Sequence, residues 1–377
     1  MTKLLHTADW QIGRIAGGFD ADAAVMLAEA RFAAVERLAQ LATDAGADAV
    51  LVAGDVFDAQ TVSARTIRRL FNALAAYGGP WVMIPGNHDA ALAESVWSHA
   101  ARLGALPANV HVALEPKAIE LSAPRLALLC APLTQRHTHA DLTEWFDGFD
   151  TAPGWLRIGL AHGAVQGLLA EGIDSANPIG PDRAVRARLD YLALGDWHGS
   201  KRIDARTWYS GTPEPDRFKD NESGQALLIE IDGPGAIPRI MPRRTAQHRW
   251  RQWAQRIDVA SDIDALEAAL AQTEAGDVID LTLAGRIDLA GQRRVASALG
   301  AAEARVRCLR SDLSALRLAP TAEDIAALHA DGYLGELVAE LRDASVDGSA
   351  DDTRRAQDAL GILTTLLAER NPDAAPA

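Results

Sequence analysis

The chain has 377 residues, of which 48% are hydrophobic and 23% are charged, and its formal net charge at pH 7 is −14. This composition is typical of folded globular proteins and excludes the disordered and fibrous classes. A length beyond the roughly 250–300 residues of a single core indicates two or more domains. The acidic charge argues against a protein that coats nucleic acid without selectivity.

The sequence contains no recognisable membrane or export segment. Its apolar runs are shorter than the roughly 18 residues of a bilayer span, and the start, Met1 to His6, lacks the basic and apolar regions of a signal peptide. We therefore expect a cytoplasmic protein without contact to a membrane. Cys130 and Cys308 lie in or beside apolar runs, where a buried thiol is the expected state.

The first half of the chain alternates short apolar runs with helical patterns, which predicts a βαβαβ rhythm. From Val110 onward strand-like runs follow one another, and we expect this body to end near Asp232. The predicted fold class is α/β (α+β), with two packed sheets flanked by helices. The expected strands are Lys3 to His6, Ala49 to Ala53, Trp81 to Ile84, Val110 to Leu114, Ala118 to Leu121, Leu126 to Ala131, Leu156 to Ala161, Tyr191 to Leu194, Trp208 to Ser210 and Ala226 to Ile231, with helices at residues 22–44 and 63–77.

Glycine and proline residues between Gly233 and Pro242 indicate a domain boundary. We expect a first domain of residues 1–240, a small α+β cap domain of residues 241–319 and terminal helices in residues 320–377. Thr321 with Asp324 predicts a capping box that opens a helix. Two later apolar stripes suit packing on the body or on a partner; they are Leu334, Leu337, Val338 and Leu341, and Leu360, Leu363 and Leu367.

Five short segments share one design, in which a polar side chain suited to metal binding directly follows an apolar strand. Side chains at the carboxyl ends of neighbouring strands converge in one crevice, and adjacent glycines leave room for ions and phosphate. One such residue alone is more often a cap, a turn or a core histidine, but five in order favour a metal site. The segments are His-Thr-Ala-Asp-Trp-Gln (Asp9, Gln11), Ala-Gly-Asp-Val-Phe-Asp (Asp55, Asp58), Pro-Gly-Asn-His-Asp (Asn87, His88, Asp89), Ala-His-Gly (His162) and Leu-Gly-Asp-Trp-His-Gly (Asp196, His198).

These segments resemble the calcineurin-like metallophosphoesterases and, within them, the SbcD-type subunits of DNA-repair exonucleases. The Asn-His-Asp triplet after Pro-Gly is the most specific part. The resemblance covers residues 1 to about 232 and implies a four-layer αββα sandwich, with the remainder as a cap domain and partner-binding helices. Further similarity to the subgroup lies in Val62-Ser63 with Thr66, in Cys130-Ala131-Pro132-Leu133 and in Tyr209-Ser210-Gly211-Thr212-Pro213-Glu214.

The resemblance also implies two divalent ions that share Asp55. His88 would stabilise charge on the phosphoryl group and pass a proton to the leaving oxygen. Asp58 or Asp89 would orient the ring of His88 by a hydrogen bond. The first ion would be held by Asp9, Gln11, Asp55 and His198, and the second by Asp55, Asn87, His162 and Asp196.

Two positions depart from the family pattern, because the family generally has histidine where Gln11 and Asp196 stand. The resulting ligand set is rich in oxygen and contains no thiolate, which favours Mn²⁺, with Mg²⁺ or Fe²⁺ as alternatives, over zinc. Gln11 could instead contact metal-bound water or substrate. The first ion would then bind more weakly.

An acid-free stretch from Gly233 to Ile257 interleaves arginine with tryptophan, a mixture that can grip a nucleic-acid backbone and stack a base. The alternative is a solvated connector between domains. The candidate DNA-binding residues are Arg243, Arg244, Arg249, Trp250, Arg251 and Trp253.

The expected function is a metal-dependent DNA exonuclease in DNA repair, which hydrolyses phosphodiester bonds with two metal ions. One alternative is a phosphodiesterase or phosphatase that acts on nucleotides or other small phosphate esters. Another is a catalytically weak scaffold subunit that binds DNA or an ATPase. As partners the resemblance implies DNA, an SbcC-type coiled-coil ATPase subunit docked on the terminal helices, and a second copy of the chain in a homodimer.

Overall fold

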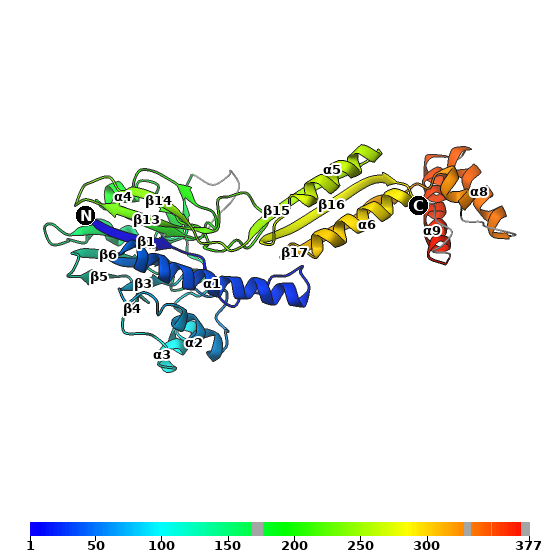
Figure 1. Cartoon of the computed structure of the whole chain (residues 1–377). Coiled ribbons are helices and arrows are strands. Elements are labelled where there is room, and N and C mark those ends of the chain that lie inside the picture. Colours follow the sequence, from blue (N-terminus) through cyan, green and yellow to red (C-terminus); the bar gives the residue numbers. More distant parts are fainter. Residues whose placement is uncertain (168–175, 328–332, 348, 371–377) are drawn as a thin grey trace. The chain divides into compact units, whose positions relative to one another are not determined.

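The computed structural model describes residues 1–167, 176–327, 333–347 and 349–370 (Figure 1). The chain forms two compact units, Met1–His248 and Arg249–Ala377. None of the described helices combines the length and the apolar character needed to cross a bilayer.

The first unit contains a six-stranded sheet with the order β14-β13-β1-β2-β3-β4. β1 to β4 are parallel neighbours, whereas β13 and β14 join this sheet in antiparallel pairing. β14 spans the boundary predicted at residue 240, and the unit continues to His248. The strands are β1 (Thr2–Thr7), β2 (Ala49–Ala53), β3 (Trp81–Ile84), β4 (Val110–Val112), β13 (Gln225–Ile231) and β14 (Arg239–Arg244).

A second six-stranded sheet has the order β11-β12-β10-β7-β6-β5. Its four central strands are parallel and its two edge strands, β11 and β5, are antiparallel. The short strands β8 and β9 pair in parallel and form a separate two-stranded sheet. The strands are β5 (Lys117–Leu121), β6 (Leu126–Ala131), β7 (Leu156–His162), β8 (Ala164–Val165), β9 (Pro178–Ile179), β10 (Tyr191–Gly195), β11 (Lys201–Arg202) and β12 (Thr207–Tyr209).

Alternating side chains hold these layers together. In β2, Val50 and Val52 pack under the helices, whereas Leu51 on the opposite face packs against the second sheet. A third apolar cluster covers the outer face of the second sheet with a short helix and a 3-10 turn. The predicted αββα sandwich is therefore confirmed. Its helices are α1 (Ala21–Ala45), α2 (Ala64–Ala73) and α3 (Val96–Arg102) on one side, and η1 (Glu144–Gly148) and α4 (Arg183–Arg186) on the other.

The second unit begins with a parallel three-stranded sheet in the order β15-β16-β17. Helix α5 connects β15 to β16, and helix α6 connects β16 to β17. Ile279, Leu281 and Leu283 of β16 pack with residues of α5 and α6, so the two helices and the sheet share one core. The elements are β15 (Arg249–Ile257), α5 (Ala260–Ala271), β16 (Asp277–Ile287), α6 (Leu289–Glu303) and β17 (Cys308–Leu318).

The terminal helices among the described residues are α7 (Ala322–Ala327), α8 (Tyr333–Asp347) and α9 (Ala350–Arg370). The predicted capping box is present, because Thr321 N donates to Asp324 at 2.8 Å and Asp324 N donates to Thr321 Oγ1 at 3.0 Å. Val338 of α8 and Leu360 of α9 are buried, so part of each predicted apolar stripe is already covered. The side chain of Leu367 lies outside the described residues.

Candidate metal centre

Three buried side chains stand at the middle of the site: Asp9 after β1, Asp55 after β2 and His162 at the end of β7. One ligand atom of each lies within 4.8 Å of the other two. The exposed fractions of the three residues are only 0%, 1% and 2%. Because buried carboxylates repel one another, a group of this kind requires a cation or protons among its members.

The backbone at this place adopts an uncommon conformation. Asp9, Gln11, Asp55 and Asp196 have positive φ angles from 46° to 100°, a region that residues with a side chain rarely enter. Two loops are tied together here, since Asp9 N donates to Gly54 O at 3.1 Å and Gln11 N donates to Asp55 O at 2.9 Å. Uncommon backbone angles that the surrounding structure maintains are frequent at functional sites.

Two glycines allow the strand-end loops to approach one another. A Cβ atom on Gly86 would lie 2.2 Å from Oδ1 of Asp55, and one on Gly54 would lie 2.3 Å from Nδ1 of His162. A side chain at either position would displace a central residue. The Gly-Asp and Pro-Gly pairs of the sequence motifs therefore have a steric reason.

His162 and Asn87 direct their polar atoms toward the two aspartates. Nδ1 of His162 lies 2.8 Å from the carbonyl oxygen of Ala53, so this nitrogen donates and Nε2 is left to face a cation. Nε2 lies 3.0 Å from Oδ1 of Asn87 and 3.6 Å from Oδ1 of Asp55. A reversed Asn87 amide would donate to Asp55 at 3.1 and 3.2 Å, whereas a cation between these atoms favours the oxygen pointing inward.

Asp196 joins this group from the loop after β10. Its backbone N–H donates to both carboxylate oxygens of Asp9, at 3.1 and 3.3 Å. Its Oδ1 lies 3.7 Å from Nε2 of His162. We refer to Asp9, Asp55, Asn87, His162 and Asp196 as the acidic centre.

Burial is the largest cause that raises the pKa values of Asp9 and Asp196 in the acidic centre. For Asp9, burial raises the pKa to about 6, and Asp55 and Asp196 add to it. Burial alone would lower the pKa of His162, but the neighbouring carboxylates outweigh it and raise this pKa to about 9. Protons thus neutralise charge that a divalent cation would neutralise when bound. The oxygen-rich acidic centre therefore fits a divalent cation.

The remaining two predicted ligands, Gln11 and His198, lie in a different hydrogen-bond network. Nε2 of His198 is 3.2 Å from Nε2 of Gln11, and its Nδ1 is 2.8 Å from Oδ2 of Asp216. Arg14 donates to Oε1 of Gln11 and lies 3.1 Å from Oδ2 of Asp216. We refer to Gln11, Arg14, His198 and Asp216 as the arginine cluster.

Asp216 is the anion of the arginine cluster. Burial favours its neutral form, but hydrogen bonds from His198 and Arg217 hold the pKa of Asp216 far below its usual range. Nε of Arg217 lies 3.0 Å from its Oδ1. The arginine cluster therefore contains a permanent counter-charge, Arg14, whereas charge in the acidic centre is neutralised by protons.

The predicted proton donor, His88, lies beside both groups. Its Nδ1 is 2.8 Å from the backbone oxygen of Asp58 and 3.8 Å from Oδ1 of the same residue. Nε2 of His88 lies 4.0 Å from Oδ2 of Asp55. Asp89 has a different environment, since its carboxylate accepts from the backbone N–H groups of Gly86 and Val56 at 2.6 and 2.9 Å. Asp58 is thus placed to orient His88, whereas Asp89 fastens two strand-end loops to each other.

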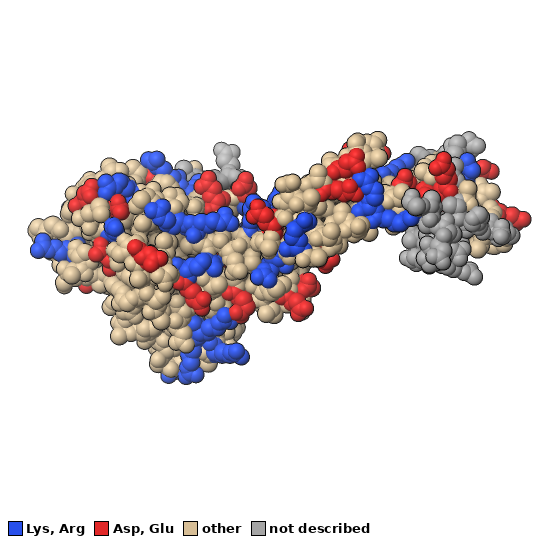
Figure 2. Space-filling view, viewed as in Figure 1, with Lys and Arg blue, Asp and Glu red and all other residues tan. Residues whose placement is uncertain are grey.

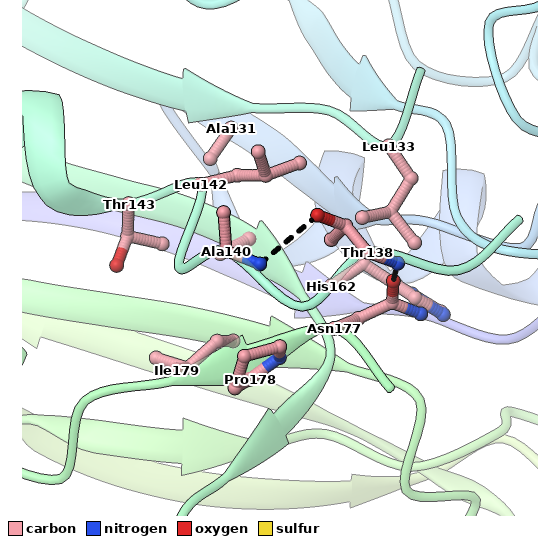
Figure 3. A pocket seen from close by; sticks show the side chains of 11 residues that line it. Ala131, Leu133, Thr138, Ala140, Leu142, Thr143, His162, Asn177, Pro178 and Ile179 are labelled. Atoms are coloured by element: carbon pink, nitrogen blue, oxygen red, sulfur yellow. Dashed lines mark hydrogen bonds between the residues drawn. The ribbon is translucent and has the colours of Figure 1, made fainter. Parts of the chain in front are cut away.

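A small pocket lies behind His162, and its lining is largely apolar (Figure 3). On its rim, Thr138 N donates to Oδ1 of Asn177 at 2.9 Å, and Asn177 N donates to Thr138 O at 2.8 Å. A Cβ atom on Gly163 would lie 2.1 Å from Asn177 O. These contacts hold the end of β7 in place and so support His162 from behind.

Three features near the site were not predicted from the sequence: Arg14, Asp216 and the surroundings of Trp197. Nζ of Lys201 and Nζ of Lys219 lie 5.2 and 4.5 Å from the ring centroid of Trp197, distances suited to cation–π contacts. Trp197 stands between Asp196 and His198 in the fifth motif, and Asp216 closely follows the Ser-Gly-Thr-Pro-Glu segment. Their closeness to the recognised motifs in the sequence could have predicted that they lie near the site.

The candidate DNA-binding residues are divided between the two units. Arg243 and Arg244 are exposed on β14, the edge strand of the first sheet. Arg249 and Arg251 on β15 instead pair with the buried Asp277, at 2.8 and 3.2 Å. Trp253 packs against the core of the second unit. On the face shown in Figure 2, basic and acidic side chains are interspersed.

Comparisons with known proteins identify a family and several relatives. The model of the calcineurin-like phosphoesterase family matches residues 2–196. A subunit of the SbcCD nuclease of Rhodobacter capsulatus is 32% identical over 295 residues, which cover 64% of this chain and 69% of that protein. Its counterpart from Bacillus subtilis is 26% identical over 62% of this chain and 67% of its own length. The uncharacterized metallophosphoesterase YhaO of Bacillus subtilis is 27% identical over 54% of this chain and 50% of its own length.

Proposed function

The chain belongs to the calcineurin-like phosphoesterase family, and from this premise we propose that it is a metal-dependent DNA exonuclease of DNA repair. The observation that carries the proposal is the acidic centre, in which buried Asp9, Asp55 and His162 direct ligand atoms to one point. Its oxygen-rich composition favours Mn²⁺. In the two-ion arrangement expected from the sequence, Asp55 would be the shared ligand.

Hydrolysis of a phosphodiester needs a nucleophile at neutral pH and compensation of the charge that develops. Bound divalent cations supply both. The residues of this chain add a proton donor, because His88 lies next to Asp55 and its Nδ1 donates to Asp58 O. This hydrogen bond leaves Nε2 of a protonated His88 to pass its proton to the leaving oxygen.

DNA is the proposed substrate in preference to a small phosphate ester. Trp197 adjoins the site and has two lysine ammonium groups near its ring. An aromatic ring beside positive charges is a common platform for an unpaired base and its phosphates. The relatives from Rhodobacter capsulatus and Bacillus subtilis are named as nuclease subunits, which supports the same substrate. A DNA substrate also supports the cytoplasm as the location.

The test compares end-labelled linear DNA with bis(p-nitrophenyl) phosphate and cyclic nucleotides, using the purified full chain with Mn²⁺. We expect labelled nucleotides to be released from linear DNA and a chelator to stop their release. Closed circular DNA is the control for cleavage inside a strand. Turnover of the small esters with intact linear DNA would contradict the nuclease proposal.

We propose an SbcC-type ATPase as a partner that docks on α8 and α9. Two observations support the proposal: the relatives are named as subunits of SbcCD, and Ile362 and Leu366 on α9 are 64% and 57% exposed. A chain that ends at Ser345 should lose copurification with the ATPase and retain the acidic centre. Unchanged copurification of that chain would refute docking on α9, the helix that the truncation removes. The homodimer stays a prediction from the resemblance.

A further inference from the structure

The acidic centre and the arginine cluster differ in whether an arginine side chain engages their potential ligand atoms. In the acidic centre, Nε2 of His162 and the carboxylate of Asp55 face each other at 3.6 Å. In the arginine cluster, Oε1 of Gln11 accepts from Arg14. The amide nitrogen of Gln11 faces Nε2 of His198 at 3.2 Å, so Gln11 presents a donor to the atom that would bind a cation.

Arg14 is held in this position by the loop that carries it. Arg14 N donates to Gln11 O at 3.1 Å. The turn passes through Gly13, where a Cβ atom would lie 2.9 Å from Cγ1 of Val62. The guanidinium lies 3.1 Å from Asp216, whose side chain is only 1% exposed. The backbone hydrogen bond and the ion pair with Asp216 together restrict the positions that the guanidinium of Arg14 can adopt.

Arg14 also reaches toward the substrate side. Its Nη1 lies 3.9 Å from Oδ1 of Asp58, the residue whose backbone oxygen accepts from His88. The side chain of Arg14 is 30% exposed, so part of it remains accessible to a ligand. A guanidinium is permanently charged and has a flat set of donors that match phosphate oxygens in pairs.

We propose that Arg14 supplies the second positive charge of this site: the acidic centre holds one divalent cation tightly, and the guanidinium beside Gln11 and His198 takes the place of a second cation. The inference rests on the proposed function, but it departs from the two-ion expectation. Arg14 repels a second cation while it holds Oε1 of Gln11. In the substrate complex the exposed part of Arg14 binds a non-bridging phosphate oxygen.

The primary test is a Mn²⁺ titration of the full wild-type chain by calorimetry, with electron paramagnetic resonance on the same samples. We expect one ion per chain in the tight step and the six-line spectrum of isolated Mn²⁺. Any further Mn²⁺ should bind at least about 10-fold more weakly, the scale on which neighbouring residues alter metal affinity. Two tightly bound ions per chain with an exchange-coupled spectrum would overturn the proposal.

Two variants test the role of Arg14 itself. Arg14→Met removes the charge and keeps the length, and combined with Gln11→His it offers an imidazole in place of the amide. The double variant should bind a second Mn²⁺ about 10- to 100-fold more tightly than the wild type does and develop an exchange-coupled spectrum. Arg14→Lys keeps the charge and should keep a single tight ion. If the folded double variant still binds one ion, Arg14 does not exclude the second one.

DNA digestion by the same samples separates this inference from the proposed function. One tight ion without cleavage of DNA would leave the assignment of Arg14 standing and refute the nuclease proposal. Two tight ions with efficient cleavage would refute the assignment of Arg14 and support the nuclease proposal. Should the double variant fail to fold, the wild-type stoichiometry still decides the inference.

Discussion

The buried aspartates of the acidic centre and Asp277 of the second unit have opposite electrostatic surroundings. In the acidic centre, burial is the largest cause that raises the pKa of Asp9 to about 6, and burial also raises the pKa of Asp196. In the second unit, burial also opposes ionisation of Asp277, but hydrogen bonds from Arg249 and Arg251 keep its pKa below the usual value. Charges left without counter-ions thus mark a binding site, whereas charges paired inside a sheet mark a structural one.

The largest expected effect separates these two classes of aspartate. Asp55→Ala should remove the tightly bound cation and reduce turnover to background, because its carboxylate lies between His162, Asn87 and His88. Asp277→Asn is the matched control in the second unit. It should keep the cation and cost about 1.5–3 kcal/mol of stability, the range for hydrogen bonds to charged groups. Metal analysis, a DNA digestion assay and thermal unfolding measure these outcomes, and a metal-bound Asp55→Ala chain would break the comparison.

His88→Ala should slow DNA cleavage by about 10²- to 10⁴-fold while the cation is retained, as expected for the loss of a proton donor. The ring contacts Asp58 O at 2.8 Å and remains 4.0 Å from Asp55, so its removal leaves the acidic centre intact. Single-turnover rates and metal content should be measured on the same protein. A parallel fall in both quantities would mean that His88 holds the cation.

Trp197→Ala should weaken binding of single-stranded DNA by about 1–3 kcal/mol, the usual contribution of one stacked base. Arg251→Ala is the comparison in the second unit and should change DNA affinity less, because Arg251 is paired with Asp277 at 3.2 Å. Fluorescence anisotropy at a fixed salt concentration measures both. A larger loss for Arg251→Ala would assign DNA binding to β15 after all.

The smallest expected effect is a pH dependence of stability in the cation-free protein. Groups with a higher pKa in the folded than in the unfolded chain bind more protons when folded, so their stabilisation is lost as pH rises. Asp89 and His162 are such groups, because their pKa values are raised to about 7 and 9. The pKa of His6 is lowered to about 3, and this opposite shift changes stability only below pH 6.5. With a chelator present, the melting temperature should therefore fall between about pH 6.5 and 9.

The expected fall is about 2–4 °C for each kcal/mol of lost stability in a unit of this size. Saturating Mn²⁺ should flatten the dependence, since a cation replaces the proton on His162. Thermal unfolding monitored by circular dichroism, with and without chelator, provides the check. A melting temperature that rises with pH in the chelated protein would contradict the assigned charges of the acidic centre.

Much of the first unit was predictable because its signals are local. Alternating apolar runs predicted β1, β2 and β3, and the polar residue after each run predicted which side chains meet at the strand ends. β14 was harder, since Pro238 and Pro242 suggested a connector. Pairing with β13 makes this segment an edge strand, a position that tolerates proline because one side of the strand needs no hydrogen bonds.

The sequence by itself determined two packed sheets flanked by helices and the chemical types of the candidate ligands, because strand periodicity and motif order are properties of neighbouring residues. Only the tertiary structure decided which atoms those side chains present to one another. Gln11 and His198 are 187 positions apart, and Arg14 meets Asp216 across the same loops. Such contacts depend on loop angles and on competing donors, which spacing along the chain does not encode.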